Sequence, residues 1–226
     1  MDTTEANRLR ERIQEMKTSG YMVKLRDGFL KLCPMPEPSN EDEELLSFMY
    51  GGHRWGSGIQ ADEALCLATY FKGCKSLLET GQAHGISTRL LGWTARKSGG
   101  SVISIDPQPF GHNEADFEAL GISDYITTIK KPSPWITLPD DLSLDGVFID
   151  GDHSFIALLA DYQLFNYYLK QGGIIAFHDV PMTEVNYAIY EIMKRDQIEE
   201  VFAVNRLKVF KKTVPARETY FQRIRR

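Results

Sequence analysis

Acidic and histidine side chains follow four short apolar runs of this chain, and such side chains can hold hydroxyl groups, bind a cation or move a proton. The runs KSLL, VISI, GVFI and GIIAF end directly before Glu79, Asp106, Asp150 and His178 with Asp179, respectively. Where such runs are parallel strands, their carboxyl ends lie at one edge of a sheet, and open α/β sheets bind ligands there. One acid after a strand can simply cap the next helix, but four in register favour a common site.

Two glycines lie in the stretch ETGQAHGIST (residues 79–88), which begins at the end of the strand predicted from the run KSLL. Gly81 and Gly85 allow a tight turn and a close approach of a ligand to the backbone, and the helix that follows offers unpaired N–H groups. The spacing differs from the dinucleotide-binding pattern G-x-G-x-x-G, which requires glycine in place of Ala83. Because Glu79 would also repel a pyrophosphate, a dinucleotide is disfavoured.

Asp106 ends the next apolar run, 27 residues beyond Glu79. A carboxylate in that place can accept hydrogen bonds from both hydroxyl groups of a ribose. The two acids together fit a nucleoside that lacks phosphates and carries a cationic group near Glu79.

Four segments together carry a family resemblance: ETGQAHGIST, SIDPQP, GVFIDGDHSF and LKQGGIIAFHDV. They resemble the class I methyltransferases that use S-adenosylmethionine, and more narrowly the branch of small-molecule and sugar O-methyltransferases in which strand four ends in an acid-Gly-x-His pattern. The resemblance covers about residues 60–212. It implies a doubly wound, Rossmann-like α/β fold with seven strands in the order 3-2-1-4-5-7-6, the last strand antiparallel.

The resemblance also implies how the cofactor is held. The loop from Glu79 to Gly85 would wrap the methionine part, with the Glu79 carboxylate near its amino end, and Asp106 would hold the ribose. The loop after strand three would lie by the adenine; it reads KKPS where relatives often show Asp or Gly-Asp, so Ser133 is the candidate contact. The full predicted cofactor set is Glu79, Thr80, Gly81, Gly85, Ser87, Asp106, Ser133 and Asp150.

Methyl transfer from a sulfonium requires alignment of donor and acceptor and, for a hydroxyl acceptor, removal of a proton. His153 lies three residues after Asp150, and its imidazole, with an ordinary pKa of about 6.5, is suited to act as the base. We therefore predict His153 and Asp150 as catalytic residues. The alternative is that His153 only caps or packs the loop.

A divalent cation is a second possibility at this edge. Asp150, His178 and Asp179 follow neighbouring strands and could converge on one ion such as Mg²⁺, which would also hold a substrate oxygen. Several sugar and macrolide relatives have such a site, but they often carry an acid at the position of His178, and a nitrogen ligand is less suited to magnesium. Without a metal, His178 and Asp179 would line the substrate pocket or cap the helix after Pro181.

The elements that must position these residues alternate as an α/β fold requires. EEVFAV and LKVFKK, on either side of Asn205 and Arg206, predict an antiparallel hairpin that closes the sheet. Gly172 and Gly173 are interpreted as the stop of the helix before strand five. The predicted strands are 75–80, 101–106, 125–130, 145–150, 172–179, 199–204 and 207–212, and the helices between them are 59–73, 87–99, 114–121, 156–170 and 184–196.

Residues 1–58 are predicted to form an N-terminal helical cap and a loop, ahead of a methyltransferase domain over residues 59–226. The glycine-flanked segment MYGGHRWGSGIQ (49–60) has the composition of a loop that closes over a ligand, and a static loop held by Trp55 is equally consistent. The N-terminal helices could cover the pocket or form a contact between two copies of the chain.

Length and composition bound the remaining function classes. The 226 residues, 42% hydrophobic and 25% charged, suit one globular domain. The formal net charge of −5 gives no reason to expect nucleic acid, and no apolar run approaches the roughly 18 residues of a membrane span. Three cysteines without metal-ligand spacing and a start without an apolar signal core predict a reduced, cytoplasmic protein.

Three alternatives share parts of this pattern. A nicotinamide-linked oxidoreductase would use Asp106 but needs the missing glycine fingerprint. A non-catalytic cofactor-binding or assembly protein would keep the fold without turnover. A metal-dependent hydrolase would use Asp150, His178 and Asp179. We predict an S-adenosylmethionine-dependent methyltransferase that acts on a hydroxyl group of a small molecule or sugar.

Overall fold

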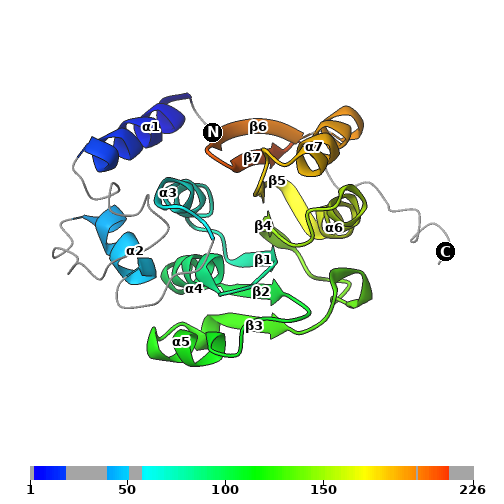
Figure 1. The fold of residues 1–226 in the computed structure, drawn as a ribbon, viewed down its shortest axis with the longest axis horizontal. Helices are drawn as coiled ribbons and strands as arrows, with labels where there is room; N and C mark the ends of the chain where they lie inside the picture. Colours follow the sequence, from blue (N-terminus) through cyan, green and yellow to red (C-terminus); the bar gives the residue numbers. More distant parts are fainter. Residues whose placement is uncertain (1–2, 19–39, 51–57, 197, 214–226) are drawn as a thin grey trace.

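A seven-stranded sheet forms the centre of the computed structural model, which describes residues 3–18, 40–50, 58–196 and 198–213. Its strands are β1 (Ser76–Thr80), β2 (Ser101–Ile105), β3 (Ile126–Ile129), β4 (Leu144–Ile149), β5 (Leu169–Phe177), β6 (Ile198–Val204) and β7 (Leu207–Lys212). They are arranged in the order β3-β2-β1-β4-β5-β7-β6 (Figure 1). β7 runs antiparallel to both of its neighbours, and the other pairs are parallel. The predicted order and the antiparallel last strand are confirmed.

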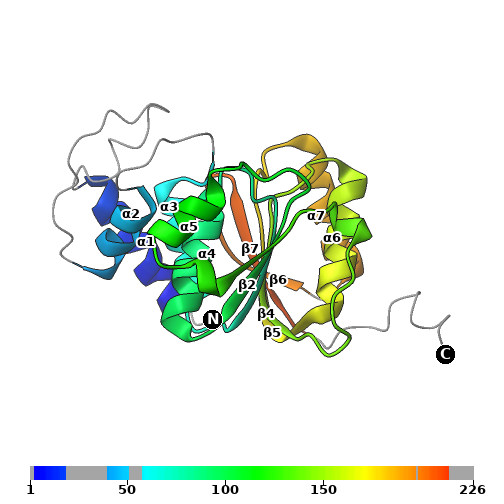
Figure 2. The ribbon, with the colours of Figure 1, turned by 90° about the horizontal axis from the view of Figure 1, so that it is seen from below.

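Helices cover both faces of the sheet, which Figure 2 shows edge-on. They are α1 (Thr3–Thr18), α2 (Glu41–Tyr50), α3 (Ala61–Tyr70), α4 (Ile86–Ser98), α5 (Asn113–Ala119), α6 (Phe155–Tyr168) and α7 (Thr183–Arg195), with the short 3₁₀ turns η2 (Ser123–Tyr125) and η3 (Ser133–Trp135). α3, α4 and α5 lie on one face, with α1 and α2 on their side of the sheet, and α6 and α7 lie on the other. The fold is therefore the predicted doubly wound α/β fold.

Alternate residues of the central strands face these two helical layers. Leu77 of β1 and Phe148 of β4 pack in the core that includes α3 and α4, whereas Leu78 and Val147 pack in the core that includes α6 and α7. Burial of each such side chain stabilises the fold by about 1.5–3 kcal/mol. Because both faces are covered, these strands read as continuous apolar runs in the sequence.

The parallel register brings the ends of four strands to one edge. Thr80 of β1 pairs with Ile105 of β2 and Ile149 of β4, and Ile149 pairs with Phe177 of β5. The residues that come next in the chain are Gly81, Asp106, Asp150 and His178. The predicted convergence of strand ends is thus a direct result of the pairing.

The end of α6 differs from its prediction. Gly172 and Gly173 lie within β5 and are not a helix stop, since α6 ends at Tyr168 and the chain passes straight into the strand. The buried ammonium group of Lys212 donates hydrogen bonds to the carbonyl oxygens of Asn166 (2.5 Å) and Leu169 (2.8 Å). A cation in this position satisfies the last carbonyls of a helix without glycine.

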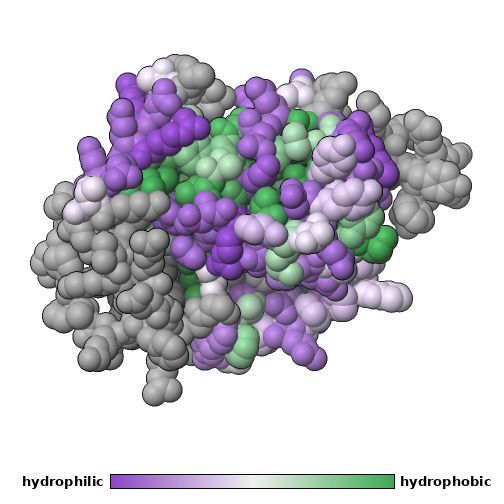
Figure 3. Space-filling model, turned by 45° about the horizontal axis from the view of Figure 1, so that its top comes forward, coloured by the Kyte–Doolittle hydropathy of each residue, from purple (hydrophilic) through white to green (hydrophobic). Residues whose placement is uncertain are grey.

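The described part of the N-terminal region packs on the domain. Leu9 and Ile13 of α1 and Leu46 of α2 are buried in the same core as Leu65 of α3. Residues 19–39 of the predicted helical cap, most of the segment 49–60 and residues 214–226 lie outside the described residues. On the face seen in Figure 3, hydrophobic side chains lie between stretches of hydrophilic ones. Among the described helices, none has the length and apolarity that a membrane span needs.

Candidate active site

The loop between β1 and α4 is shaped by glycine. Gly81 has a φ of +87°, and a Cβ there would lie 2.0 Å from the carbonyl oxygen of Asp150. Gly85, the N-cap of α4, has a φ of +73° and supplies no side-chain cap to the first turn. Backbone N–H groups at this helix start are thus available for a ligand, as the sequence predicted.

Two buried amides support this loop from below, and sequence reasoning missed both. Gln82 Nε2 donates to Ser104 Oγ and to Thr128 Oγ1, each at 3.0 Å. Asn113 Nδ2 donates to Gln82 Oε1 (3.0 Å) and to the carbonyl oxygen of Ala83 (2.8 Å). These bonds fix the loop against β2, β3 and α5.

Asp106 is half-buried at the end of β2 and faces the same loop. Its Oδ2 accepts from the Ala83 amide (2.8 Å) and its Oδ1 from the Gln108 amide (2.7 Å). A carboxylate has about four acceptor positions, so both oxygens retain capacity for the two hydroxyls of a ribose. Asp106, the predicted ribose contact, is thus hydrogen-bonded directly to the loop between β1 and α4.

Glu79 is fully buried behind the loop, where its Oε2 accepts from Thr88 Oγ1 and Ser104 Oγ, both at 2.6 Å. Burial raises its pKa to about 7. Oε1 is a buried acceptor without a partner among the described residues. The carboxyl group is therefore enclosed in this structure, while its unpartnered oxygen is suited to a donor arriving from the loop. Thr80 and Ser87, also in the predicted cofactor set, are buried.

Ser133 lies in η3, and its hydroxyl donates to Asp161 of α6. Burial raises the pKa of the Asp161 carboxyl. This bond ties the loop after β3 to α6. The predicted adenine contact of Ser133 is consequently made, if at all, by a hydroxyl already donating to Asp161.

Asp150, His153 and Asp179 come together at the ends of β4 and β5. One candidate ligand atom from each lies within 4.8 Å of the others. His153 Nε2 is 3.1 Å from Asp179 Oδ2 and 3.6 Å from Asp150 Oδ1, and about a third of the side chain, 36%, is exposed. Its interaction with Asp150 raises the pKa of His153. Nε2 itself is buried, and a partly exposed imidazole beside two carboxylates can accept a proton and be stabilised as the cation.

His178 is almost fully buried, and each of its ring nitrogens faces a carboxylate. Nδ1 lies 3.1 Å from Asp150 Oδ1, and Nε2 lies 3.2 Å from Glu63 Oε2. Burial alone would lower the pKa of His178, but the bonds to Asp150 and Glu63 outweigh it and raise the pKa to about 10. A doubly protonated ring has no lone pair for a metal. Among the described residues, the cluster that could hold a metal is Asp150, Asp179 and His153. The predicted role of His178 as a metal ligand stays a prediction.

Arg206, in the turn between β6 and β7, completes the surroundings of Asp179. Its Nη1 donates to Asp179 Oδ1 (2.8 Å) and its Nη2 to the Gly58 carbonyl (2.9 Å). Asp179 has a φ of +52°, an uncommon conformation for a residue other than glycine. The guanidinium thus holds the carboxylate of Asp179, and the backbone of the same residue is constrained by its positive φ.

Glu63 and Arg206 are functional candidates that sequence reasoning missed. Glu63 is the third residue of α3. It forms a capping box with Gln60, in which the backbone N–H of Gln60 donates to Glu63 Oε2 at 2.7 Å. The spacing Gln-x-x-Glu was visible in the sequence, but it indicates only a helix start.

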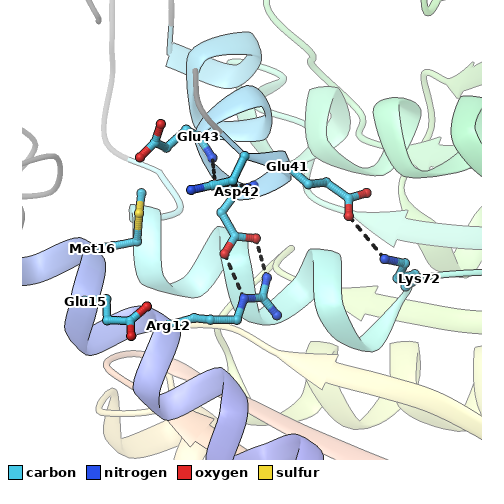
Figure 4. A pocket seen from close by; sticks show the side chains of 8 residues that line it. Arg12, Glu15, Met16, Glu41, Asp42, Glu43 and Lys72 are labelled. Carbon is cyan, nitrogen blue, oxygen red and sulfur yellow. Dashed lines mark hydrogen bonds and ion pairs between the residues drawn. The ribbon is translucent and has the colours of Figure 1, made fainter. Parts of the chain in front are cut away.

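A cavity of about 550 Å³ lies away from this edge, near the other end of α3 (Figure 4). Arg12 pairs there with Asp42, and Lys72 with Glu41 at 3.2 Å. The other lining residues are Glu15, Met16, Asn40 and Glu43. Four of its charged side chains, Arg12, Asp42, Glu41 and Lys72, already have partners, and none of the candidate site residues lines the cavity.

Comparison with known proteins gives a domain match and a fold. Residues 78–180 match a family model described as a methyltransferase domain, a span that contains all four strand ends but neither Glu63 nor Arg206. A search of functionally described proteins gave no match.

Solved structures share the fold at low sequence identity. A Podospora anserina methyltransferase bound to S-adenosylhomocysteine is 14% identical over 89% of this chain and 96% of its own, with a TM-score of 0.61. An O-methyltransferase of tomaymycin synthesis from Streptomyces achromogenes, in complex with S-adenosylmethionine, is 12% identical over 78% and 92%, with a TM-score of 0.57. A Bacillus cereus O-methyltransferase in complex with S-adenosylhomocysteine is 15% identical over 78% and 93%, with a TM-score of 0.54. The domain match confirms the predicted resemblance to methyltransferases, and the solved structures confirm the fold. The narrower resemblance to small-molecule and sugar O-methyltransferases stays a prediction.

Proposed function

We propose that this chain, which carries a class I methyltransferase domain, transfers a methyl group from S-adenosylmethionine to a hydroxyl group of a small molecule. The observation that carries the proposal is the position of His153, which lies between the carboxylates of Asp150 and Asp179 at the edge that also holds the glycine loop. A base and a candidate cofactor site thus share one edge of the sheet.

The residues present fit the cofactor. Its sulfonium supplies an activated methyl group when bound. Gly81 and Gly85 adopt positive φ and let the loop pack closely against Asp150 and Asn113. Asp106 retains acceptor capacity for the ribose hydroxyls, and Glu79 Oε1 is a buried acceptor without a partner among the described residues. Ser133 is retained as the candidate adenine contact.

His153 would accept the proton of the acceptor hydroxyl. Because its pKa is raised, the neutral form that acts as base is populated only at a pH above the ordinary value. Asp150 and Asp179 stabilise the imidazolium that results. General base catalysis of this kind contributes about 10²–10⁴-fold to the rate.

Apolar side chains beside the base suit an organic acceptor. The Phe155 ring, two residues after His153, stacks on Tyr187 with ring centres 5.2 Å apart. Ile156 and Met182, at the starts of α6 and α7, are 73% and 46% exposed. Ligand sites commonly combine such apolar surface with a few polar groups.

A divalent cation would take Asp150, Asp179 and His153 as ligands, since both nitrogens of His178 face carboxylates. Two carboxylates and one imidazole suit a transition metal better than magnesium. Such an ion would replace the base role of His153, because a coordinated nitrogen cannot accept a proton. Titration in the presence and absence of a chelator separates the two cases.

The test begins with calorimetric titration of the protein with S-adenosylhomocysteine, with NAD as the comparison. Formation of the demethylated cofactor is then followed with a panel of hydroxylated acceptors. We expect His153→Gln to abolish most turnover and His112→Gln, an exposed histidine before α5, to retain it. Failure of S-adenosylhomocysteine to bind would refute the proposal, and binding without turnover on any acceptor would favour the non-catalytic alternative.

A further inference from the structure

Glu63 makes contacts that reach both carboxylates of the candidate active site. It is 0% exposed. Its Oε2 lies 3.2 Å from His178 Nε2, and its Oε1 accepts from the backbone amide of Arg206 at 3.0 Å. One side chain of α3 therefore touches the end of β5 and the turn between β6 and β7.

The first arm runs through His178 to Asp150. Since both ring nitrogens face carboxylate oxygens, the imidazole has one favourable orientation; a flipped ring would turn carbon atoms toward Asp150 and Glu63. Hydrogen bonds in which a partner is ionised are shorter and stronger than those between neutral groups. Glu63 thereby fixes the ring that holds Asp150 Oδ1.

The second arm runs through Arg206 to Asp179. Glu63 holds the backbone of Arg206, and the guanidinium of Arg206 holds Asp179 Oδ1 at 2.8 Å. A residue other than glycine persists at positive φ only when its surroundings determine it, and Asp179 is such a residue. Charges alternate along both arms, from Glu63 through a cation to a carboxylate.

We propose that Glu63 is a positioning residue that orients Asp150 and Asp179, through His178 and Arg206, on either side of His153. The inference rests on the proposed function for its effect on turnover. Glu63 and Arg206 both lie outside the span 78–180 that matches the methyltransferase domain. The matched span contains Asp150, His153 and Asp179, which we call the reacting edge. Glu63 and Arg206, which we call the clamp, come from the flanking segments.

The direct test observes His178 without cofactor or acceptor. Glu63→Gln keeps the size of the side chain and one acceptor oxygen but removes the carboxylate that faces Nε2. In histidine-labelled protein, we expect nuclear magnetic resonance to show ring N–H signals of His178 that are protected from solvent exchange in the wild type and shifted and less protected in E63Q. Unchanged signals would overturn the proposal, whatever the fate of the methyltransferase assignment.

The second readout is the rate of methyl transfer, measured with S-adenosylmethionine and the most active of the hydroxylated acceptors. We expect E63Q to lower kcat about 10–100-fold, the range for residues that orient catalytic ligands, while the affinity for S-adenosylhomocysteine stays at the wild-type value. Asp62→Asn is the matched control, because Asp62 is the neighbouring buried carboxylate and accepts from Asn205 Nδ2 at 2.6 Å. Equal losses in both variants would assign the effect to the start of α3 as a whole and overturn the proposal.

A shorter side chain covers the case in which E63Q does not fold. Glu63→Asp keeps the charge and withdraws the carboxylate by one methylene group from His178. We expect E63D to show the same altered His178 signals and a reduced kcat. Wild-type signals and wild-type kcat in E63D would refute the positioning role.

Discussion

Replacement of Gly81 by alanine tests whether the end of β1 must be glycine to fit against β4. A Cβ on Gly81 would lie 2.0 Å from the Asp150 carbonyl oxygen and 2.5 Å from its carbonyl carbon. Backbone atoms cannot rotate away, so the ends of β1 and β4 would have to separate by about 1 Å. That movement weakens the hydrogen bond from the Asp150 amide to the Thr80 carbonyl, now 3.0 Å long.

The magnitude follows from three contributions. The φ of +87° costs alanine about 1–2 kcal/mol, the weakened hydrogen bond about 1 kcal/mol, and the displaced backbone about 1–3 kcal/mol by analogy with overpacked cores. We expect Gly81→Ala to lower the free energy of unfolding by about 3–6 kcal/mol, within the range of severe single substitutions.

Gly73→Ala is the matched control for this experiment. Gly73 has a φ of +81°, but a Cβ there would meet nothing within 4 Å. It should therefore cost only the backbone contribution, about 1–2 kcal/mol. Urea unfolding of both variants gives the difference, and S-adenosylhomocysteine titration of G81A should show weakened binding. If G81A is no less stable than G73A, the close approach of Gly81 to Asp150 is not a constraint.

Three further predictions concern the same edge. Asp106→Ala should weaken S-adenosylhomocysteine binding by about 1.5–3 kcal/mol, the value of hydrogen bonds to a charged group; an unchanged calorimetric affinity would contradict the ribose assignment. His153→Gln should lower turnover about 10²–10⁴-fold with cofactor affinity retained, and the wild-type rate should rise with pH through a midpoint above the ordinary histidine pKa, because Asp150 raises the pKa of His153. Burial raises the pKa of Glu79 from 4.5 to about 7, so the folded protein binds this proton more tightly than the unfolded chain. The resulting contribution to stability is full below the unfolded pKa and is lost as pH rises through about 7. The free energy of unfolding of Glu79→Gln, measured across this window, should lack that loss, and an identical pH dependence in both proteins would contradict the assignment.

The fold and the reacting edge could be predicted because their signals are local. Short apolar runs punctuated by glycines and acids indicate parallel strands and their ends. Because Thr80, Ile105 and Ile149 pair in register, the residues that follow them in the chain lie side by side at one edge of the sheet. The predicted cofactor contacts of Asp106 and Ser133 stay predictions.

The clamp around Asp150 and Asp179 could not be predicted, since it depends on contacts between distant segments. Glu63 and Arg206 are 143 residues apart, and their spacing carries no pattern. The surroundings of His178 depend on Glu63, whose carboxylate faces the second ring nitrogen at 3.2 Å. The error at Gly172 has a similar cause, because the end of α6 is held by Lys212 from the last strand.

The position of Arg206 in the final hairpin also bears on when the site forms during synthesis. Glu63, Asp150 and His178 all precede the turn between β6 and β7 in chain order, so they are synthesised before the guanidinium that holds Asp179. The antiparallel insertion of β7 between β5 and β6 then brings Arg206 to Asp179 and Glu63. The hairpin that completes the sheet therefore also carries the guanidinium of the reacting edge.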